Sequence, residues 1–241
     1  MSLKEIALPD YKLRHELWNS ISHGLGALFG IFVMIFCLIK VVNNGFDMNA
    51  IPSDPHSYTN YICKIISVIL YSLGLIITYT ISCIYHALGK HNNKRVLRVI
   101  DHDTVYLLIA GTYTPYCLIS LRDVYLYGVI PNCGYLIFTV VWILVIIGIV
   151  FNSININKFK IVSFVMYIAA GWTIIFASYE IYMAIGQNGF LLLLFGGISY
   201  TLGSILYGLG GKYSVWFHTV FHFFVLAGTI LQFISIYLYV I

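Results

Sequence analysis

Apolar stretches about twenty residues long alternate with short polar segments along almost the whole chain. A helix of ~20 apolar residues crosses the ~30 Å hydrocarbon core of a bilayer. The pattern predicts seven such helices, at residues 20–42, 62–88, 102–121, 128–151, 161–183, 190–210 and 214–240. Residues 43–61 are rich in Asn, Pro and Asp, which favour an exposed turn region over a helix. We expect an all-α, multi-pass membrane bundle over residues 20–241, preceded by a cytoplasmic amino-terminal segment of residues 1–19.

The composition supports the interpretation of the chain as a membrane protein but does not indicate which membrane holds it. Of the 241 residues, 60% are hydrophobic and only 9% are charged, whereas an average soluble domain has roughly 25% charged residues. The first apolar stretch lacks a small-residue cleavage pattern, so we interpret it as a retained helix and not a signal peptide. The five cysteines lie in or beside apolar stretches without a CxxC pair, as small buried hydrophobes do. The scattered basic residues lack interleaved aromatic residues, which argues against nucleic acid as a partner.

The distribution of Lys and Arg predicts the orientation, because basic residues in short loops tend to stay cytoplasmic. Ten of the thirteen fall in the amino-terminal segment and the second, fourth and sixth loops: Lys4, Lys12, Arg14, Lys90, Lys94, Arg95, Arg98, Lys158, Lys160 and Lys212. Lys40, Lys64 and Arg122 fall on the other face. We therefore expect a cytoplasmic amino terminus and an outside carboxyl terminus, the reverse of the usual G-protein-coupled receptor.

Three histidines form a candidate metal site. His218 and His222 are four residues apart on one face of the last helix, about 6 Å apart along its axis, although two unrelated interfacial histidines would share that spacing. The predicted orientation places His86, at the end of the second helix, at the same cytoplasmic depth. Three imidazoles with an open fourth position are typical of catalytic zinc. Cys83 could replace His86 as a thiolate ligand, but a buried free cysteine is the simpler interpretation.

Asp101 and Ser82 are candidate catalytic residues beside these histidines. Zinc would lower the pKa of a bound water towards about 7 and polarise a carbonyl. Asp101 could accept or orient the water proton, while Ser82 could hydrogen-bond to the water or to an oxyanion. Two alternatives remain open at this point. Asp101 could stabilise the first turn of its helix through the macrodipole, and Ser82 could bond to its own helix.

Glu16, Asn19 and His23 occupy positions i, i+3 and i+7 at the start of the first helix. This spacing places them on one helical stripe, at the cytoplasmic end. We interpret the stripe as a support that orients a metal ligand or fixes helix packing. A capping role or a solvated helix face is the alternative.

Other polar and small residues receive simpler interpretations. We expect His102 and Asp103, which flank Asp101, to be interfacial. Glu180 lies near the outer end of the fifth apolar stretch, where its carboxylate is expected to reach water and have no catalytic role. Gly26 and Gly30 form a GxxxG step, which usually marks close helix packing.

Together these motifs resemble the hemolysin III group of the progestin and adiponectin receptor family over nearly the whole chain. The residues that carry the resemblance are Glu16, Asn19 and His23 in ELWNSISH, Ser82 and His86 in SCIYHAL, Asp101 before TVYLLIAGTYTP, Gly171 and Trp172, and His218 and His222 in HTVFH. The resemblance implies seven helices, a cytoplasmic amino terminus and a zinc ion held by His86, His218 and His222. It also implies that Asp101 and Ser82 lie near the water on that zinc.

Three functions fit these expectations. The first is a zinc-dependent intramembrane hydrolase that acts on a membrane lipid amide or ester, as ceramidase-like members of the family do. The second is a cytolytic, pore-forming protein, as the family name implies. A pore would require oligomers, because a single bundle with so few intramembrane charges offers no obvious polar conduit. The third is a receptor-like protein with structural zinc, in which a protein atom takes the fourth metal position.

Overall fold

The computed structural model of the chain describes residues 6–45, 57–89 and 92–241. Within these ranges the regular elements are helical, apart from one isolated β-bridge between Leu126 and Ile130, so the all-α prediction is confirmed. The α-helices are α1 (Leu13–Asn43), α2 (Ser57–Ala87), α3 (Asn92–Pro115), α4 (Cys133–Ile154), α5 (Lys160–Gly171), α6 (Ser178–Tyr213) and α7 (Trp216–Ser235). The π-helices η3 (Tyr116–Ser120) and η5 (Ile236–Val240) and the 3-10 helix η4 (Thr173–Ala177) complete them.

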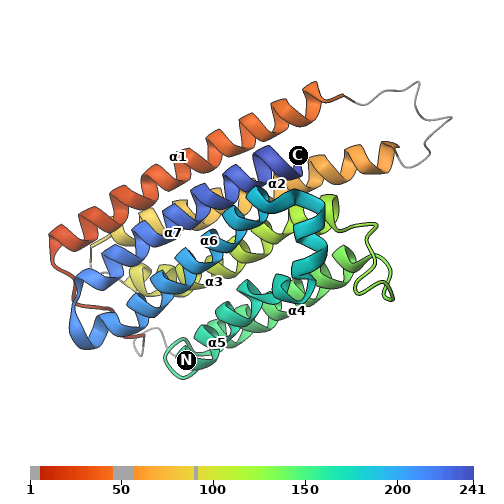
Figure 1. The fold of residues 1–241 in the computed structure, drawn as a ribbon. Helices are drawn as coiled ribbons and strands as arrows, with labels where there is room; N and C mark the ends of the chain where they lie inside the picture. Colours follow the sequence, from red (N-terminus) through yellow and green to blue (C-terminus); the bar gives the residue numbers. More distant parts are fainter. Residues whose placement is uncertain (1–5, 46–56, 90–91) are drawn as a thin grey trace.

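The long helices lie lengthwise beside one another in a bundle (Figure 1). Consecutive helices are neighbours from α1 to α5, α6 packs against α7, and α7 returns to contact α1. Short connections favour this order, because a chain that leaves one helix meets the next beside it. The return of α7 brings its first turns together with the start of α1 and the end of α2.

Among the described residues, five helical segments are long and apolar enough to cross a bilayer: Leu13–Asn43, Tyr58–Ala87, Cys133–Ile154, Lys160–Gly210 and Trp216–Val240. The fourth has 51 residues, far more than the ~20 that one crossing needs. It is interrupted by η4 and by Gly186, whose φ of 70° and ψ of 174° break the helix. Figure 1 shows a short piece there that runs across the bundle. The count of seven crossings and the side of each terminus stay predictions.

The helices extend beyond the apolar stretches that predicted them. α1, α2 and α3 begin at Leu13, Ser57 and Asn92, before the predicted starts at 20, 62 and 102. Hydropathy marks only the part of a helix that faces hydrocarbon, whereas its backbone hydrogen bonds continue into the interface. Residues 1–5, 46–56 and 90–91 lie outside the described part of the chain, so predictions that fall on them, including those for Lys4 and Lys90, are not tested.

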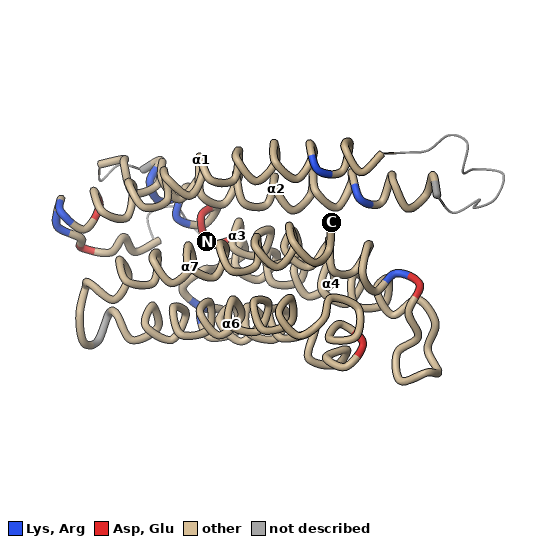
Figure 2. The backbone as a smooth tube through the Cα atoms, turned by 45° about the horizontal axis from the view of Figure 1, so that its top comes forward, with Lys and Arg blue, Asp and Glu red and all other residues tan. Residues whose placement is uncertain are grey.

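The charged residues are unevenly placed along the bundle. Figure 2 shows Lys and Arg gathered mainly at the end where α1 begins, with fewer at the opposite end. The starts of α1 and α7 and the end of α2 share that basic end (Figure 1). The candidate metal site therefore lies among the helix ends that carry most of the positive charge.

Close packing of α1 depends on Gly26 and Gly30. A Cβ atom at Gly26 would lie 2.7 Å from Tyr79 Cδ1 on α2 and 2.9 Å from Leu226 Cδ2 on α7. A Cβ atom at Gly30 would lie 3.0 Å from Ile76 Cγ1. These approaches agree with the GxxxG prediction, and they hold α1 against both helices that carry the histidines.

Candidate metal centre

The structure brings the three predicted histidines together. His86, in the last turn of α2, and His218 and His222, in the first turns of α7, are all buried. His218 Nε2 lies 3.1 Å from His86 Nε2 and 3.2 Å from His222 Nε2. One ligand nitrogen from each ring can be chosen so that all lie within 4.8 Å of one another.

Hydrogen bonds to the far ring nitrogens fix which nitrogens face the centre. His86 Nδ1 lies 2.6 Å from Glu16 Oε2, and because a carboxylate only accepts, Nδ1 is the donor. His222 Nδ1 lies 3.3 Å from Ser22 Oγ, whose hydroxyl already donates to the Asn19 carbonyl oxygen. The lone pairs on Nε2 of His86 and His222 therefore both point to the centre of the group.

These residues fit a metal ion. A proton on His218 Nε2 can fully satisfy only one of the two facing lone pairs, whereas a cation at the centre satisfies all three facing Nε2 atoms. Tetrahedral zinc with Zn–N bonds of 2.0–2.1 Å holds its ligand nitrogens about 3.3 Å apart, close to the observed 3.1 and 3.2 Å. Imidazole nitrogen also suits copper, iron and nickel, so the donor set does not by itself select zinc.

A buried ion pair holds His86 in place. The Glu16 carboxylate accepts two hydrogen bonds, one from His86 Nδ1 at Oε2 and one from Lys94 Nζ at Oε1, both at 2.6 Å. Lys94 also donates to the Leu88 carbonyl oxygen at 2.8 Å. Glu16 thus fixes the orientation of the His86 ring, and its part in supporting a metal ligand stays a prediction. In the sequence, Lys94 contributes only to the charge distribution that predicts the orientation in the membrane. No residue spacing links it to Glu16, which lies 78 residues away.

The other members of the predicted stripe contribute differently. The His23 ring stacks on the His222 ring, with centroids 3.6 Å apart. Asn19 supplies its backbone carbonyl to Ser22, while among the described residues its side-chain amide has no hydrogen-bond partner. Tyr11, which sequence reasoning missed, stacks on His218 with centroids 5.1 Å apart. The solvated-face alternative does not hold, because Asn19 and His23 are buried.

Asp101 lies beside the histidines and not at a helix end. α3 begins at Asn92, so Asp101 is beyond the first turn and the macrodipole alternative does not hold. Ser82 lines the same cavity as Asp101 and lies close enough to interact with its carboxylate. Cys83 faces α1, with Sγ 3.4 Å from Ser20 Oγ, and does not belong to the group of histidines.

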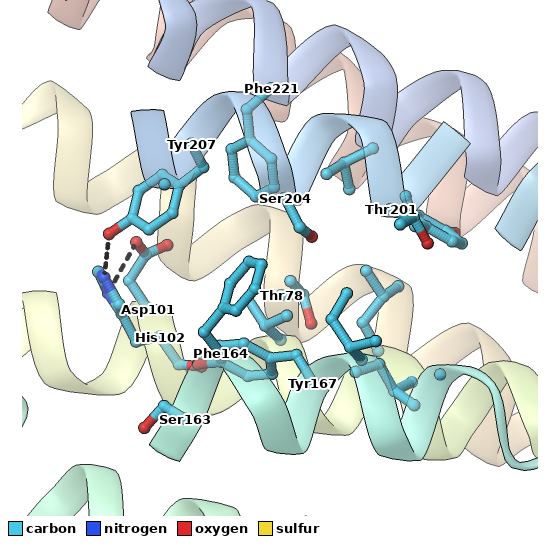
Figure 3. Close-up of a pocket in the computed structure, with 18 of the residues that line it drawn as sticks. Thr78, Asp101, His102, Ser163, Phe164, Tyr167, Thr201, Ser204, Tyr207 and Phe221 are labelled. Atoms are coloured by element: carbon cyan, nitrogen blue, oxygen red, sulfur yellow. Dashed lines mark hydrogen bonds and ion pairs between the residues drawn. The ribbon is translucent and has the colours of Figure 1, made fainter. Parts of the chain in front are cut away.

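A cavity of about 550 Å³ connects these residues. Ser82, Asp101, His218 and His222 all line it, and Gln232 lines it further along α7. Most of its wall is apolar or aromatic. Figure 3 shows Asp101, His102 and Tyr207 together at one end, Phe164, Tyr167 and Phe221 along the wall, and Thr201 towards the other end.

His102 and Asp103 occupy different surroundings, which only the structure separates. His102 Nδ1 donates to the Arg98 carbonyl oxygen at 2.7 Å, and its Nε2 accepts from the Tyr207 hydroxyl at 2.8 Å. The His102 side chain lines the cavity (Figure 3), and its place at the membrane interface stays a prediction. Asp103 instead accepts hydrogen bonds from Asn152 on α4 at 2.7 Å.

Comparison with known proteins identifies the family of this chain. The family model described as Haemolysin-III related matches residues 11–233. The chain is 30% identical over 229 residues to a protein named Hemolysin-3 homolog from Bacillus subtilis (strain 168), covering 95% of this chain and 96% of that one. It is 31% identical over 229 residues to Hemolysin-3 from Bacillus cereus, covering 95% and 93%. No solved structure matches the chain. The chain therefore belongs to the haemolysin-III-related proteins of the progestin and adiponectin receptor family, and it is a multi-pass integral membrane protein.

Proposed function

We propose that this protein is a zinc-dependent intramembrane hydrolase of a lipid amide or ester. The observation that carries the proposal is the shared cavity. His218, His222, Asp101 and Ser82 line one chamber inside a bundle of membrane helices. Metal ligands and a carboxylate on the wall of an apolar chamber suit a substrate that is itself largely apolar.

The shape of the cavity supports a long-chain substrate. Its lining runs from His218 to Gln232, which are about 21 Å apart along α7 at ~1.5 Å per residue. Its volume of about 550 Å³ falls within the ~300–1,000 Å³ of small-molecule sites. An acyl chain could lie along the apolar wall with its amide or ester carbonyl at the end near the histidines.

The residues of the site have separate roles in this proposal. His86, His218 and His222 hold the zinc, which when bound supplies Lewis-acid chemistry that polarises a carbonyl and acidifies water. The Asp101 carboxylate accepts a proton from the attacking water and passes it to the leaving group. Ser82 holds that carboxylate through its hydroxyl, and Glu16 keeps the His86 ring in its donating orientation.

The test is hydrolysis by purified, zinc-loaded protein of a ceramide-like amide and of a lipid ester. We expect Asp101→Asn to keep zinc and lose roughly 10²- to 10⁴-fold in rate. His218→Ala should lose both zinc and activity. Asp103→Asn is the matched control, because its carboxylate bonds to Asn152, away from the histidines. If the loaded protein cleaves neither lipid, or if His218→Ala cleaves as well as the parent, the hydrolase proposal is wrong.

The names of the relatives, both hemolysins, favour a second candidate, a cytolytic protein. Dye release from liposomes that persists after removal of zinc would support it, and several copies would then have to assemble into a pore. A structural role for zinc is the remaining outcome. It is indicated if chelation lowers stability, no lipid is cleaved, and a metal-bound structure shows a protein atom at the fourth position.

A further inference from the structure

A second hollow lies at the other end of the bundle, and it shares no residue with the cavity at the histidines. It has a volume of about 440 Å³ and lies between the connection that follows η3 and the first turns of α6. Tyr125, Tyr127, Tyr179, Glu180 and Met183 line it. Figure 1 shows this connection at the end of the bundle away from the start of α7. The metal centre therefore does not account for these residues.

Glu180 is buried in this hollow with half of its carboxylate unused. The residue is 6% exposed, so the expectation that it reaches water was wrong. Its Oε1 accepts a hydrogen bond from the Tyr127 backbone N–H at 2.8 Å. Its Oε2 has no hydrogen-bond partner among the described residues, and no Lys or Arg in that part of the chain pairs with it. A buried anionic oxygen without a partner is costly, so the site favours a cation.

The rest of the lining is aromatic. Tyr125, Tyr127 and Tyr179 are 57%, 69% and 67% exposed, so their rings are accessible to a ligand from outside. The Tyr127 hydroxyl donates to the Phe176 carbonyl oxygen at 2.6 Å, which ties this ring to the segment just before α6. Tyrosine faces attract cations through the negative face of the ring, and such rings commonly recognise quaternary ammonium groups.

We propose that this hollow binds a quaternary ammonium group, presented either by a lipid headgroup or by a free small cation. A primary ammonium carries three N–H donors, whereas Glu180 Oε2 is the one buried side-chain acceptor without a partner among the described residues that line the hollow. A fully alkylated ammonium has no donors to satisfy and covers more of the aromatic wall. Calcium takes 6–8 oxygen ligands, and a single free carboxylate oxygen does not provide them. The inference does not depend on hydrolysis at the histidines.

The test uses the full chain in nanodiscs of phosphatidylglycerol, with tetramethylammonium as the probe in a calorimetric titration. We expect saturable binding that choline displaces and that ammonium displaces poorly. Glu180→Gln keeps an acceptor for the Tyr127 N–H but removes the charge, and Tyr179→Leu removes one aromatic face. Each should weaken binding by about tenfold or more. Asp123→Asn, whose side chain is 72% exposed, and Tyr135→Leu at the start of α4 are matched controls that should bind as the parent does.

The source of the ammonium group is tested in nanodiscs of phosphatidylcholine. Weaker apparent binding of tetramethylammonium there assigns the site to a lipid headgroup, and equal binding assigns it to a free cation. The proposal is overturned if tetramethylammonium does not bind saturably, or if both Glu180→Gln and Tyr179→Leu bind it as tightly as the parent. Glu180 would then serve only to fix the connection through Tyr127, and the tyrosines would be interfacial anchors.

Discussion

Replacing Glu16 by glutamine tests how far the metal centre depends on its supporting ion pair. The substitution keeps the shape of the side chain but removes the charge that faces both His86 Nδ1 and Lys94 Nζ at 2.6 Å. Two separate effects are expected. The hydrogen bond that orients His86 weakens, and the buried Lys94 ammonium loses its counter-ion. Lys94 still donates to the Leu88 carbonyl oxygen and lies 5.1 Å from the centroid of the Tyr85 ring.

The burial of the pair sets the size of each effect. The Glu16 and Lys94 side chains are 16% and 4% exposed, so solvent screens them little. Breaking a buried ion pair typically costs about 3–5 kcal/mol, and the partial exposure of Glu16 and the remaining Leu88 contact place this case near 3 kcal/mol. Loss of a residue that orients a metal ligand usually lowers metal affinity roughly 10- to 100-fold.

A double variant separates the two effects. Glu16→Gln with Lys94→Met removes the unpaired charge, so most of the stability should return, while zinc affinity should stay low because His86 still lacks its carboxylate. The measurements are thermal unfolding in detergent and competition for zinc against a chelator of known affinity. If Glu16→Gln binds zinc within about twofold of the parent, or if the double variant regains full zinc affinity, the orienting role of Glu16 is refuted.

Further predictions concern packing, the cavity and the metal. Gly26→Ala should lower the free energy of unfolding by roughly 1–3 kcal/mol, because its Cβ would lie 2.7 Å from Tyr79, whereas Gly197→Ala, with nothing within 4 Å, should not. Tyr207→Phe should cost about 1–3 kcal/mol in the same unfolding assay, because His102 Nε2 loses its donor at 2.8 Å; an unchanged stability would contradict the hydrogen bond. Removal of bound metal with a chelator should lower the melting temperature. Added zinc should restore it, whereas magnesium, which prefers oxygen ligands, should not. Equal rescue by both ions would argue against a site made of imidazoles.

Much of the cluster of three histidines was predictable because it follows from periodicity. His218 and His222 share a helix face through their spacing of four residues, and the count of basic residues placed His86 at the same end without reference to its chemistry. Glu16 could be placed on a helix face by the same reasoning, but the atom it contacts could not. Hydropathy likewise located the apolar parts of the helices but not their polar ends, because only the apolar part is selected to lie in the hydrocarbon core.

The sequence by itself determined that the chain is an all-α membrane protein with three histidines at one end of its bundle. Only the tertiary structure decided the contacts between helices far apart in sequence. It pairs Lys94 with Glu16, places Ser82 beside Asp101, opens the cavity to His102 and buries Glu180 against the Tyr127 backbone. Spacing along one helix fixes which residues share a face. The helix that this face meets is chosen by packing. The GxxxG step predicts a close approach at Gly26, but it does not say that Tyr79 of α2 and Leu226 of α7 are the residues approached.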